Sequence, residues 1–199
     1  MREAGSVAED EVVLAFLKAE IESPRFGPIY VDILQNSALD RTALIERANL
    51  SSDTDNRTRL ELLKTVRGYR ADAYLFRNFP ADIRWRRVDL TPVDVGNLKY
   101  ANFPTWTKLS GGTRLVADGA RNIDRIQTAE NANANIKAVA KAVAAGQRYP
   151  ELITVEASDG ALILVEGHTR ATAYVVAALP EPVACFVGSS RRMRLWAFY

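Results

Sequence analysis

Apolar residues recur with a helical period in the first part of the chain and in shorter, strand-like runs after Pro80. In the first 80 residues the apolar side chains are spaced three or four positions apart, which predicts amphipathic helices. These helices are expected over 11–21, 29–34, 43–48 and 57–67. Ser51–Asp55 has the composition of a loop and helix cap, and Gly68 is placed to end the last helix. Residues 1–80 therefore predict a helical N-terminal region.

The chain after Pro80 alternates between predicted strands and helices. Strands are expected over 85–90, 152–157, 161–165 and 183–187. Ser158–Gly160 is a turn signal that joins the middle two strands as a hairpin. A long helix is predicted from Ile123, through Ala129 and an alanine-rich stretch, to Gly146. Residues 81–199 thus predict an α+β domain with a small mixed sheet and packed helices. The apolar end Leu195–Tyr199 is expected to pack within the protein or against a partner.

The most informative stretch is the passage from the predicted strand Leu162–Val165 into a predicted helix that runs through Ala171 and Tyr174. Gly167 marks the change of period, and a glycine there lets the backbone approach a ligand closely. The amides and dipole of a first helical turn attract phosphate or carboxylate. His168 and Arg170 would add charge-assisted hydrogen-bond donors. This stretch predicts an anion-binding helix start.

Composition limits the class of protein. The chain has 199 residues, of which 48% are hydrophobic and 25% charged, as in globular proteins with a substantial core. A formal charge of +2 and a pI near 8.7 permit nucleic-acid contact without a strongly basic footprint. The sequence has no apolar run long enough to cross a membrane, and its acidic start is unlike a secretory signal. The expectation is a cytoplasmic protein with no membrane partner.

The chain has one cysteine and one histidine. A disulfide framework and a Cys/His zinc site are both excluded, because neither can be assembled from one residue of each kind. Any Ser-His-Asp mechanism would have to use His168. Cys185 lies in an apolar run, so a buried small side chain is favoured over a reactive thiol.

A second loop, Ser110–Arg114, combines two glycines with hydroxyls and a cation. The backbone amides, Ser110 and Thr113 would offer hydrogen-bond donors to a phosphate, and Arg114 would contact a terminal oxygen. An ordinary turn is the favoured alternative for this loop. If both loops line one cleft, nucleotide binding becomes the stronger interpretation.

Arginines form two clusters that suit contact with a DNA or protein partner. The first contains Arg84, Arg86 and Arg87, and the second contains Arg191, Arg192 and Arg194 next to Trp196 and Phe198. Arginine beside aromatic residues fits phosphate contact and base stacking. Solvated surface, or docking of the tail onto the body of the protein, is the favoured alternative.

The predicted elements follow the order strand, helix, hairpin, glycine loop and helix, and the loop carries Gly167-His-Thr-Arg170 followed by Ala173. This combination resembles the ParB/sulfiredoxin-like superfamily over residues 82–188. The resemblance does not extend to the first 80 residues. It implies that Gly167, His168, Thr169 and Arg170 hold the phosphates of ATP or CTP. Sulfiredoxins need a cysteine directly after the loop glycine, and His168 at that position argues against cysteine sulfinate reduction.

The middle residues of the loop leave the chemistry open between branches of this family. Partition proteins carry acidic and basic residues where this chain has His168 and Thr169, whereas free-amino-acid kinases of this fold have loop histidines. Phosphoryl transfer needs cationic clamps, a carboxylate and usually Mg²⁺. Glu166 and His168 are the candidate catalytic pair, with Glu156 as a second carboxylate. The alternative for these residues is structural: Glu166 exposed at a strand end, His168 as a helix cap and Arg170 in a salt bridge.

The sequence therefore predicts a nucleotide- or phosphate-binding protein, acting as an NTPase or small-molecule phosphotransferase through the Gly167–Arg170 loop. The second hypothesis is a non-enzymatic DNA- or protein-binding adaptor of the same fold. A nuclease is disfavoured because no paired-acid metal motif is visible.

Overall fold

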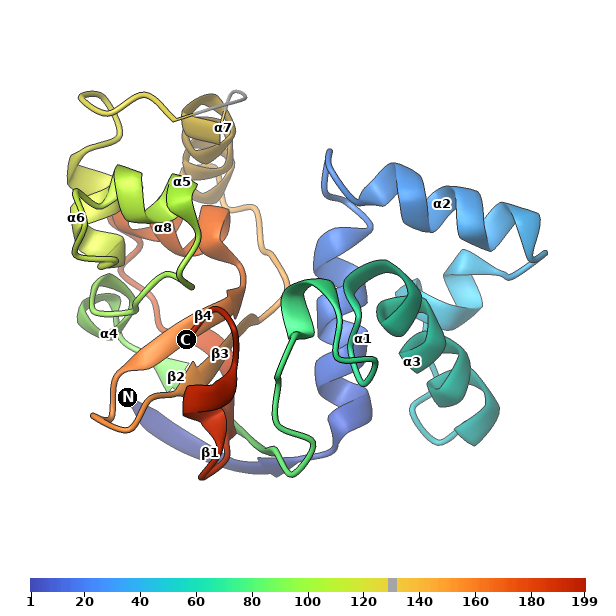
Figure 1. Cartoon of the computed structure of the whole chain (residues 1–199). Helices are drawn as coiled ribbons and strands as arrows, with labels where there is room; N and C mark the ends of the chain where they lie inside the picture. The colour runs from blue at the N-terminus through green and yellow to red at the C-terminus, as the bar shows by residue number, and fades with distance from the viewer. Residues whose placement is uncertain (129–131) are drawn as a thin grey trace. The chain divides into compact units, whose positions relative to one another are not determined.

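The computed structural model describes residues 1–128 and 132–199 and divides the chain into two compact units (Figure 1). The sheet unit consists of Met1–Ser6, Asp82–Arg194 and Phe198–Tyr199, and the helical unit of Val7–Ala81 and Leu195–Ala197. The division at Ala81 and Asp82 lies next to the boundary predicted from the sequence. Each end of the chain departs from a simple two-part order, because the first six residues join the sheet unit and three residues near the C-terminus join the helical unit.

The helical unit contains the helices expected from its apolar spacing. They are α1 (Glu9–Glu20), α2 (Gly27–Asn36), the π-helix η1 (Thr42–Glu46) and α3 (Asp53–Arg67). The 3₁₀ helix η2 (Tyr74–Phe76) was not predicted. Ser52 caps α3 by accepting a hydrogen bond from the backbone N–H of Asp55. Gly68 ends α3 with a φ of 79°, and a Cβ there would lie 2.1 Å from the Ala73 carbonyl oxygen. The predicted cap and stop of this helix are therefore confirmed.

Two buried charged residues fasten the helices of this unit. Arg59 is fully buried and donates to the backbone oxygens of Leu44 at 2.9 Å and Asn49 at 3.0 Å. Glu20 accepts from the Tyr30 hydroxyl at 2.9 Å and pairs with Arg67 at 3.1 Å. Buried charges persist only when they are paired in this way, so these contacts fix how the helices of the unit pack.

The sheet unit is built on a five-stranded sheet with the order β1-β2-β5-β3-β4. The strands are β1 (Arg2–Val7), β2 (Arg84–Leu90), β3 (Leu152–Glu156), β4 (Leu162–Glu166) and β5 (Val183–Ser189). β5 runs antiparallel to β2 and parallel to β3, and β3 forms the predicted hairpin with β4. The sheet is therefore mixed, and the α+β class predicted from the sequence is confirmed.

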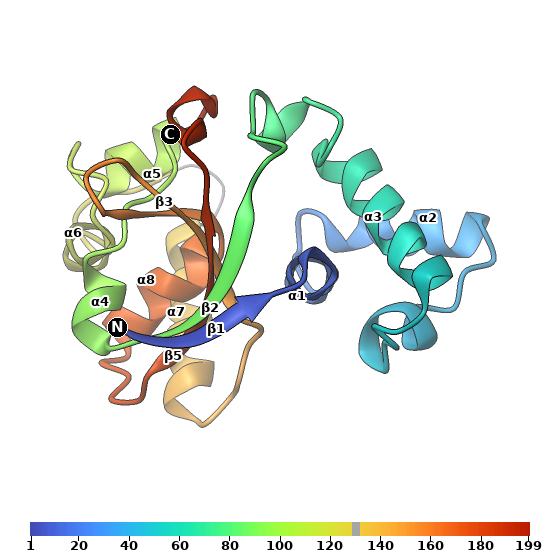
Figure 2. The same ribbon diagram turned by 90° about the horizontal axis from the view of Figure 1, so that it is seen from below.

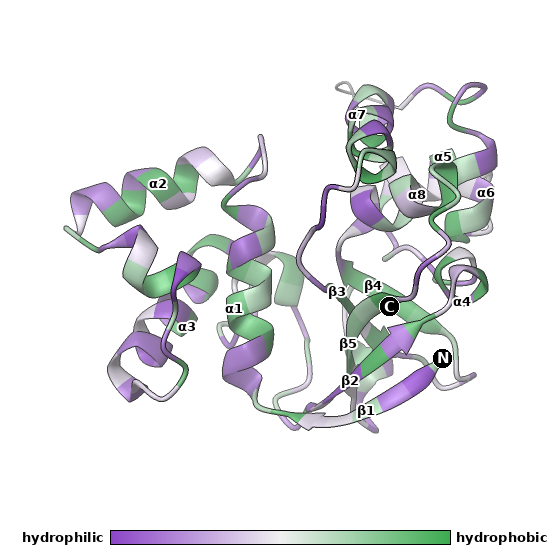
Figure 3. Cartoon of the chain, turned by 180° about the vertical axis from the view of Figure 1, so that it is seen from behind, coloured by the Kyte–Doolittle hydropathy of each residue, from purple (hydrophilic) through white to green (hydrophobic). Residues whose placement is uncertain are grey.

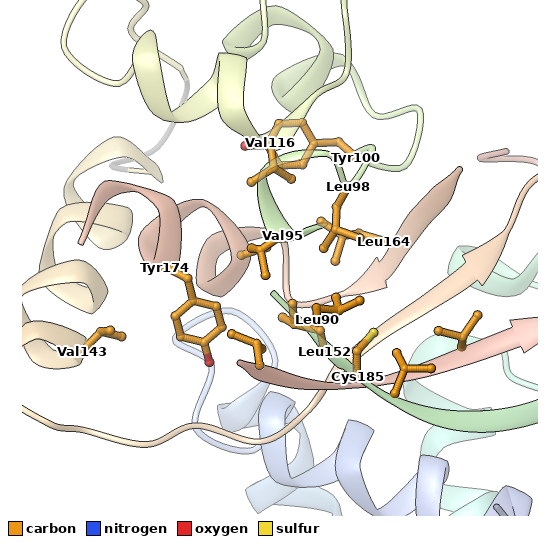
Figure 4. Close-up of a cluster of buried hydrophobic side chains, with 14 residues drawn as sticks. Leu90, Val95, Leu98, Tyr100, Val116, Val143, Leu152, Leu164, Tyr174 and Cys185 are labelled. Carbon is orange, nitrogen blue, oxygen red and sulfur yellow. The ribbon is translucent and has the colours of Figure 1, made fainter. Parts of the chain in front are cut away.

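Helices cover one side of this sheet, as Figure 2 shows for α4, α7 and α8. The helices are α4 (Pro92–Gly96), α5 (Pro104–Leu109), α6 (Val116–Arg121), α7 (Ala132–Ala144) and α8 (His168–Val176), followed by the 3₁₀ helix η3 (Met193–Leu195). The core between them contains Leu90, Leu152, Leu164 and Cys185 from the strands and Tyr174 from α8 (Figure 4). α8 contacts α4, α6 and α7, so it is the central helix of the unit.

The helix predicted to begin at Ile123 is wrong in its first part. α7 begins at Ala132, residues 122–125 form a turn that continues irregularly to residue 128, and the predicted helical position Ala129 lies outside the described residues. Ile123 and Ile126 pack with Ile136 of α7, so their apolar spacing reflects burial of a turn. The Asn133 side-chain amide donates to the carbonyls of Ile123 and Ile126, both at 2.8 Å, and thereby holds this turn against the helix.

Strand β1 was not expected from the sequence, because residues 2–7 lack apolar alternation. Its six residues are almost wholly exposed, and in Figure 3 the strand is purple near its N-terminal end and nearly white beyond it. Arg2 pairs with Asp89 of β2 at 2.6 Å, and the N-terminal amine pairs with Asp94 at 2.6 Å. Backbone pairing and these ion pairs therefore hold β1 at the edge of the sheet, although the strand has no apolar face. Among the described residues, no helix has the length and apolar character that a membrane span requires.

Candidate functional site

Gly167 converts strand β4 directly into helix α8. Its φ is 102°, a left-handed conformation that favours glycine, and a Cβ would lie 2.4 Å from the Leu152 Cδ2 atom. The Gly167 carbonyl accepts the Ala171 N–H at 2.8 Å, which starts the helical hydrogen-bond ladder. The amides of the first turn precede this ladder and have no carbonyl partner within the helix. The predicted strand, glycine and helix are therefore present in the predicted order, and the helix begins at His168, two residues before the predicted Arg170, with Thr169 partly exposed on its first turn.

His168 points into the unit and lies among aromatic rings. Its ring centroid is 5.9 Å from that of Tyr100, 5.3 Å from Trp106 and 5.7 Å from Phe103. The Ala101 backbone N–H donates to His168 Nε2 at 3.2 Å, a hydrogen bond that requires this nitrogen to be unprotonated. The residue is 8% exposed, so His168 is a buried neighbour of the loop.

Arg170 is directed toward the start of β3. It donates to Glu166 Oε1 at 3.1 Å, to the Glu151 carbonyl at 3.2 Å and, in a short hydrogen bond, to the Pro150 carbonyl. The residue is 7% exposed. The geometry matches the salt-bridge alternative for Arg170 and places the predicted carboxylate, Glu166, in the same ion pair.

The hydroxyls of the second predicted loop serve its own turn. Ser110 Oγ donates to backbone oxygens of α5 and accepts from the Arg114 N–H at 2.9 Å. Thr113 Oγ1 bonds to Asp118 Oδ2 at 2.5 Å and accepts the Leu115 N–H at 3.1 Å. Both side chains therefore fix the loop conformation in which Arg114 adopts a φ of 63°.

Arg114 has an unused donor. Its Nε donates to the Tyr100 carbonyl at 2.8 Å and its Nη1 to the main-chain oxygen of Tyr199 at 3.1 Å. Its Nη2 is buried and has no hydrogen-bond partner among the residues that the structure describes. Burial lowers the pKa of the guanidinium from its ordinary value. A cation with an unsatisfied buried nitrogen is the feature of the sheet unit that most directly indicates an anionic ligand.

The two predicted loops meet at one peptide group. The Tyr100 carbonyl, bound by Arg114, and the Ala101 N–H, bound by His168, belong to the same peptide unit. The Tyr100 N–H also donates to the Arg114 carbonyl at 2.7 Å. The structure therefore brings Arg114 and His168 to one peptide group, whereas the Arg170 side chain is directed toward the start of β3.

Comparison with known proteins adds no relative to this geometry. No protein-family model, curated protein or solved structure matches the chain. The site must therefore be interpreted from its own residues.

Sequence reasoning missed the segment that connects the two loops. Tyr100, Phe103 and Trp106 are spaced three positions apart and all place their rings around the only histidine of the chain. That regular aromatic spacing was the available signal. The contact of Arg114 with Tyr199 joins residues that are 85 positions apart and had no comparable signal.

The carboxylates near the site are paired with arginines. Glu156, the second candidate base, pairs with Arg86 at 3.2 Å, and Arg87 pairs with Glu151 at 3.0 Å. Within the described ranges, no three His, Cys, Asp or Glu side chains are grouped so that they could hold a metal ion. Any Mg²⁺ at this site would therefore have to be held largely by the phosphates of its ligand.

The predicted arginine clusters differ in availability. Arg86 and Arg87 are ion-paired, but Arg84 is exposed and lies opposite Ser189 in the register of β2 and β5. Its position brings it to the end of β5, after which the chain continues into the second cluster. Within the two predicted clusters, Arg84, Arg191, Arg192 and Arg194 are exposed and have no ion pair among the residues that the structure describes.

A cavity of about 620 Å³ lies apart from the predicted site residues. It is bordered by the end of α7, residues 146–151 and residues 179–184, and Tyr149, Tyr174 and Arg87 contribute to its walls. None of the residues predicted to bind phosphate lines it. Tyr174 lies towards the C-terminal end of α8, whereas the candidate anion site lies at its start.

Proposed function

We propose that the sheet unit binds a nucleotide or a related phosphate ligand between Arg114 and the start of α8. The observation that carries the proposal is the buried Nη2 of Arg114, which lacks a partner among the described residues. A buried donor without a partner costs about 1–3 kcal/mol, and a phosphate oxygen would remove this cost. Although burial lowers its pKa, an arginine side chain stays charged at neutral pH.

The start of α8 supplies the second half of the proposed site. The amides of its first turn have no carbonyl partner within the helix, and together with the positive end of the helix dipole they favour an anion; Thr169 is partly exposed there. His168 ties this turn to the Tyr100–Ala101 peptide, on which Arg114 also rests. An anion bound by Arg114 would therefore lie beside a turn that already favours negative charge.

A ParB/sulfiredoxin-like fold of the sheet unit forms part of the proposal. Strand β2, the hairpin β3–β4, the Gly167 loop, α8 and β5 follow one another in the order that the resemblance implies. ATP and CTP are accordingly the first ligands to test, each with Mg²⁺. In this proposal Arg170 differs from its predicted role, because it positions the loop through Glu166 and the start of β3.

Ligand binding is favoured over phosphoryl transfer by the state of the two candidate catalytic residues. Glu166 is held by Arg170, and His168 Nε2 accepts a backbone hydrogen bond. A general base needs a free lone pair aimed at the substrate. Loss of NTP turnover in Glu166→Gln without loss of ligand affinity would establish the enzymatic alternative.

A thermal-shift panel of ATP, CTP, GTP and their diphosphates with Mg²⁺ tests the proposal. A ligand at about 100 times its dissociation constant adds roughly 2.7 kcal/mol to stability, which corresponds to a shift of several degrees. The shift should be lost in Arg114→Ala and reduced in Arg114→Lys, which keeps the charge but loses the planar fork. Arg125→Ala removes an exposed arginine of the same unit and should keep the shift. No shift with any of these compounds contradicts the proposal.

The exposed arginine cluster supports a second candidate function, an adaptor that binds nucleic acid or an acidic protein. Arg191 and Arg192 are both exposed, and Arg84 approaches them through the pairing of β2 with β5. Binding through such a patch should weaken as salt rises, because counterions are released from the partner. If Arg191→Glu/Arg192→Glu abolishes binding to a duplex DNA fragment while nucleotide binding persists, the chain has both functions; equal DNA binding by wild type and variant contradicts this candidate.

A further inference from the structure

The last two residues of the chain, Phe198 and Tyr199, dock onto three loops of the sheet unit. The Phe198 carbonyl accepts the Asn102 N–H at 2.9 Å. The Tyr199 hydroxyl accepts the Ser158 N–H at 2.7 Å and bonds to the Ser158 hydroxyl at 3.1 Å. The Phe198 ring lies 4.5 Å from the Phe103 ring, centroid to centroid. The pair is therefore held by specific contacts at both its backbone and its side chains.

The main-chain oxygen of Tyr199 occupies a donor of the proposed phosphate site. It accepts from Arg114 Nη1 at 3.1 Å, next to the buried Nη2 that has no partner among the described residues. Phosphate oxygens bind arginine most strongly when two nitrogens of the guanidinium donate together. With Tyr199 docked, its main-chain oxygen accepts from Arg114 Nη1, and Arg114 Nη2 has no acceptor among the described residues.

The contacts that hold the two residues are few and individually modest in free energy. Phe198 and Tyr199 are both only partly buried, and a single hydrogen bond contributes on the order of 0.5–1.5 kcal/mol net. Release would free Arg114 Nη1 from the Tyr199 main-chain oxygen. It would also release the Phe103 ring, which lies next to His168 at the start of α8.

We propose that Phe198–Tyr199 is an internal competitor, in which the Tyr199 main-chain oxygen stands where a phosphate oxygen of the ligand binds. This inference rests on the proposed function, because it takes Arg114 as the phosphate contact. The ligand binds the form in which the two residues are released, so its apparent dissociation constant is the intrinsic value divided by the fraction of that form. Substitutions that loosen docking raise this fraction and tighten binding.

Isothermal titration of Mg-ATP and Mg-CTP into matched variants tests the competition. Tyr199→Phe removes both contacts with Ser158 and keeps the ring, and Phe198→Ala removes packing on Phe103. Each variant should bind with a dissociation constant about threefold to tenfold lower than that of the wild type, since each loses contacts that keep Phe198 and Tyr199 docked. Tyr74→Phe, a hydroxyl deletion on a tyrosine that is 69% exposed, should bind as the wild type does.

Amide hydrogen exchange at Asn102 reports docking directly, because this N–H donates to the Phe198 carbonyl. Exchange at Asn102 should become faster in Phe198→Ala, and also in the wild type when the nucleotide is saturating. If wild type and tail variants bind nucleotide with the same dissociation constant, or if Asn102 exchange does not rise on binding, the competitor role is overturned and the proposed function stands. If no protein binds either nucleotide, the proposed function is overturned and the competitor role falls with it.

Discussion

Arg170 shows how a cation at a helix start can be structural. Its guanidinium holds the Glu166 carboxylate and the carbonyls of Pro150 and Glu151, so it connects the end of β4 to the beginning of β3. The arginine side chain is 8% exposed and that of Glu166 is 22% exposed. Removing one partner of a buried pair leaves the other charge without compensation, which makes the arginine important for stability whatever the ligand.

Arg170→Ala is expected to lower the free energy of unfolding by about 2–4 kcal/mol, because Glu166 and two carbonyls lose their donor. Urea unfolding followed by circular dichroism measures this change. Arg148→Ala is the control: its pair with Glu181 is solvent-exposed and should contribute little. A variant at Arg170 as stable as the control would show that the guanidinium network is not structural.

Cys185 is expected to be unreactive in the folded protein. The side chain is fully buried, and burial raises the pKa of its thiol to about 12. The reactive thiolate is therefore almost absent at pH 8, and reagent access is also blocked. Labelling with a thiol reagent should proceed only in denaturant; rapid labelling of the native protein at pH 8 would contradict the buried placement.

Residue-scale prediction from the sequence succeeded where a run of neighbours determined the environment. The apolar run around Cys185 predicts its burial, which the structure confirms. The direction of the Arg170 side chain depends on carbonyls 19 and 20 positions away, and local sequence carries no information about them. The same holds for Arg114, whose contacts lie at Tyr100 and Tyr199.

At the scale of elements, the junction of β4 and α8 decides the geometry of the site. Gly160 precedes β4 and has a φ of 80°, and Gly167 follows β4 and has a φ of 102°. They differ in surroundings, because a Cβ at Gly167 would meet Leu152 at 2.4 Å and a Cβ at Gly160 would meet nothing within 4 Å. Substitutions at the two glycines therefore separate the cost of a left-handed backbone from the cost of close packing.

Gly160→Ala is expected to cost about 1–2 kcal/mol, which is the usual penalty for a left-handed non-glycine residue. Gly167→Ala should cost roughly 1–3 kcal/mol more, because its Cβ must displace the Leu152 side chain. Thermal unfolding of both variants measures the difference. Equal losses at the two positions would show that Leu152 does not constrain the start of α8.

Element prediction was reliable where period and end signals agreed. Ser52 and Gly68 delimit α3, and the hairpin turn at Ser158–Gly160 separates two apolar strands. It failed at α7, because the apolar side chains of Ile123 and Ile126 continue the helical spacing into a turn held by the Asn133 amide. It also missed β1, whose polar residues are placed by pairing at the sheet edge rather than by burial.

At the scale of the whole molecule, the chain leaves the sheet unit after β1, builds the helical unit, and contributes Leu195–Ala197 to it again near the C-terminus. Trp196 carries this second contribution. It is 2% exposed, its Nε1 donates to the Leu75 carbonyl at 2.7 Å, and its ring packs edge-on against Phe79 at 5.6 Å. The apolar C-terminal sequence predicted packing against protein, and the burial of Trp196 confirms it.

Trp196→Ala should destabilise the helical unit by about 3–5 kcal/mol, through loss of a buried ring and its hydrogen bond. Hydrogen exchange of the amides in α1 and α3 measures this loss. Trp196→Phe keeps most of the ring and should lose much less, and Leu195→Ala, at a residue that is 50% exposed, should lose little. Unchanged exchange in Trp196→Ala would contradict the assignment of this segment to the helical unit.

The central claim is that Arg114 provides a phosphate contact beside the start of α8. Isothermal titration of Mg-ATP and Mg-CTP into the wild type, Arg114→Ala and Arg125→Ala tests it most directly. Loss of a hydrogen bond to a charged group costs about 1.5–3 kcal/mol, so Arg114→Ala should bind at least about tenfold more weakly than the wild type. Arg125→Ala should match the wild type. Equal affinity of wild type and Arg114→Ala, or no binding by the wild type, would contradict the claim.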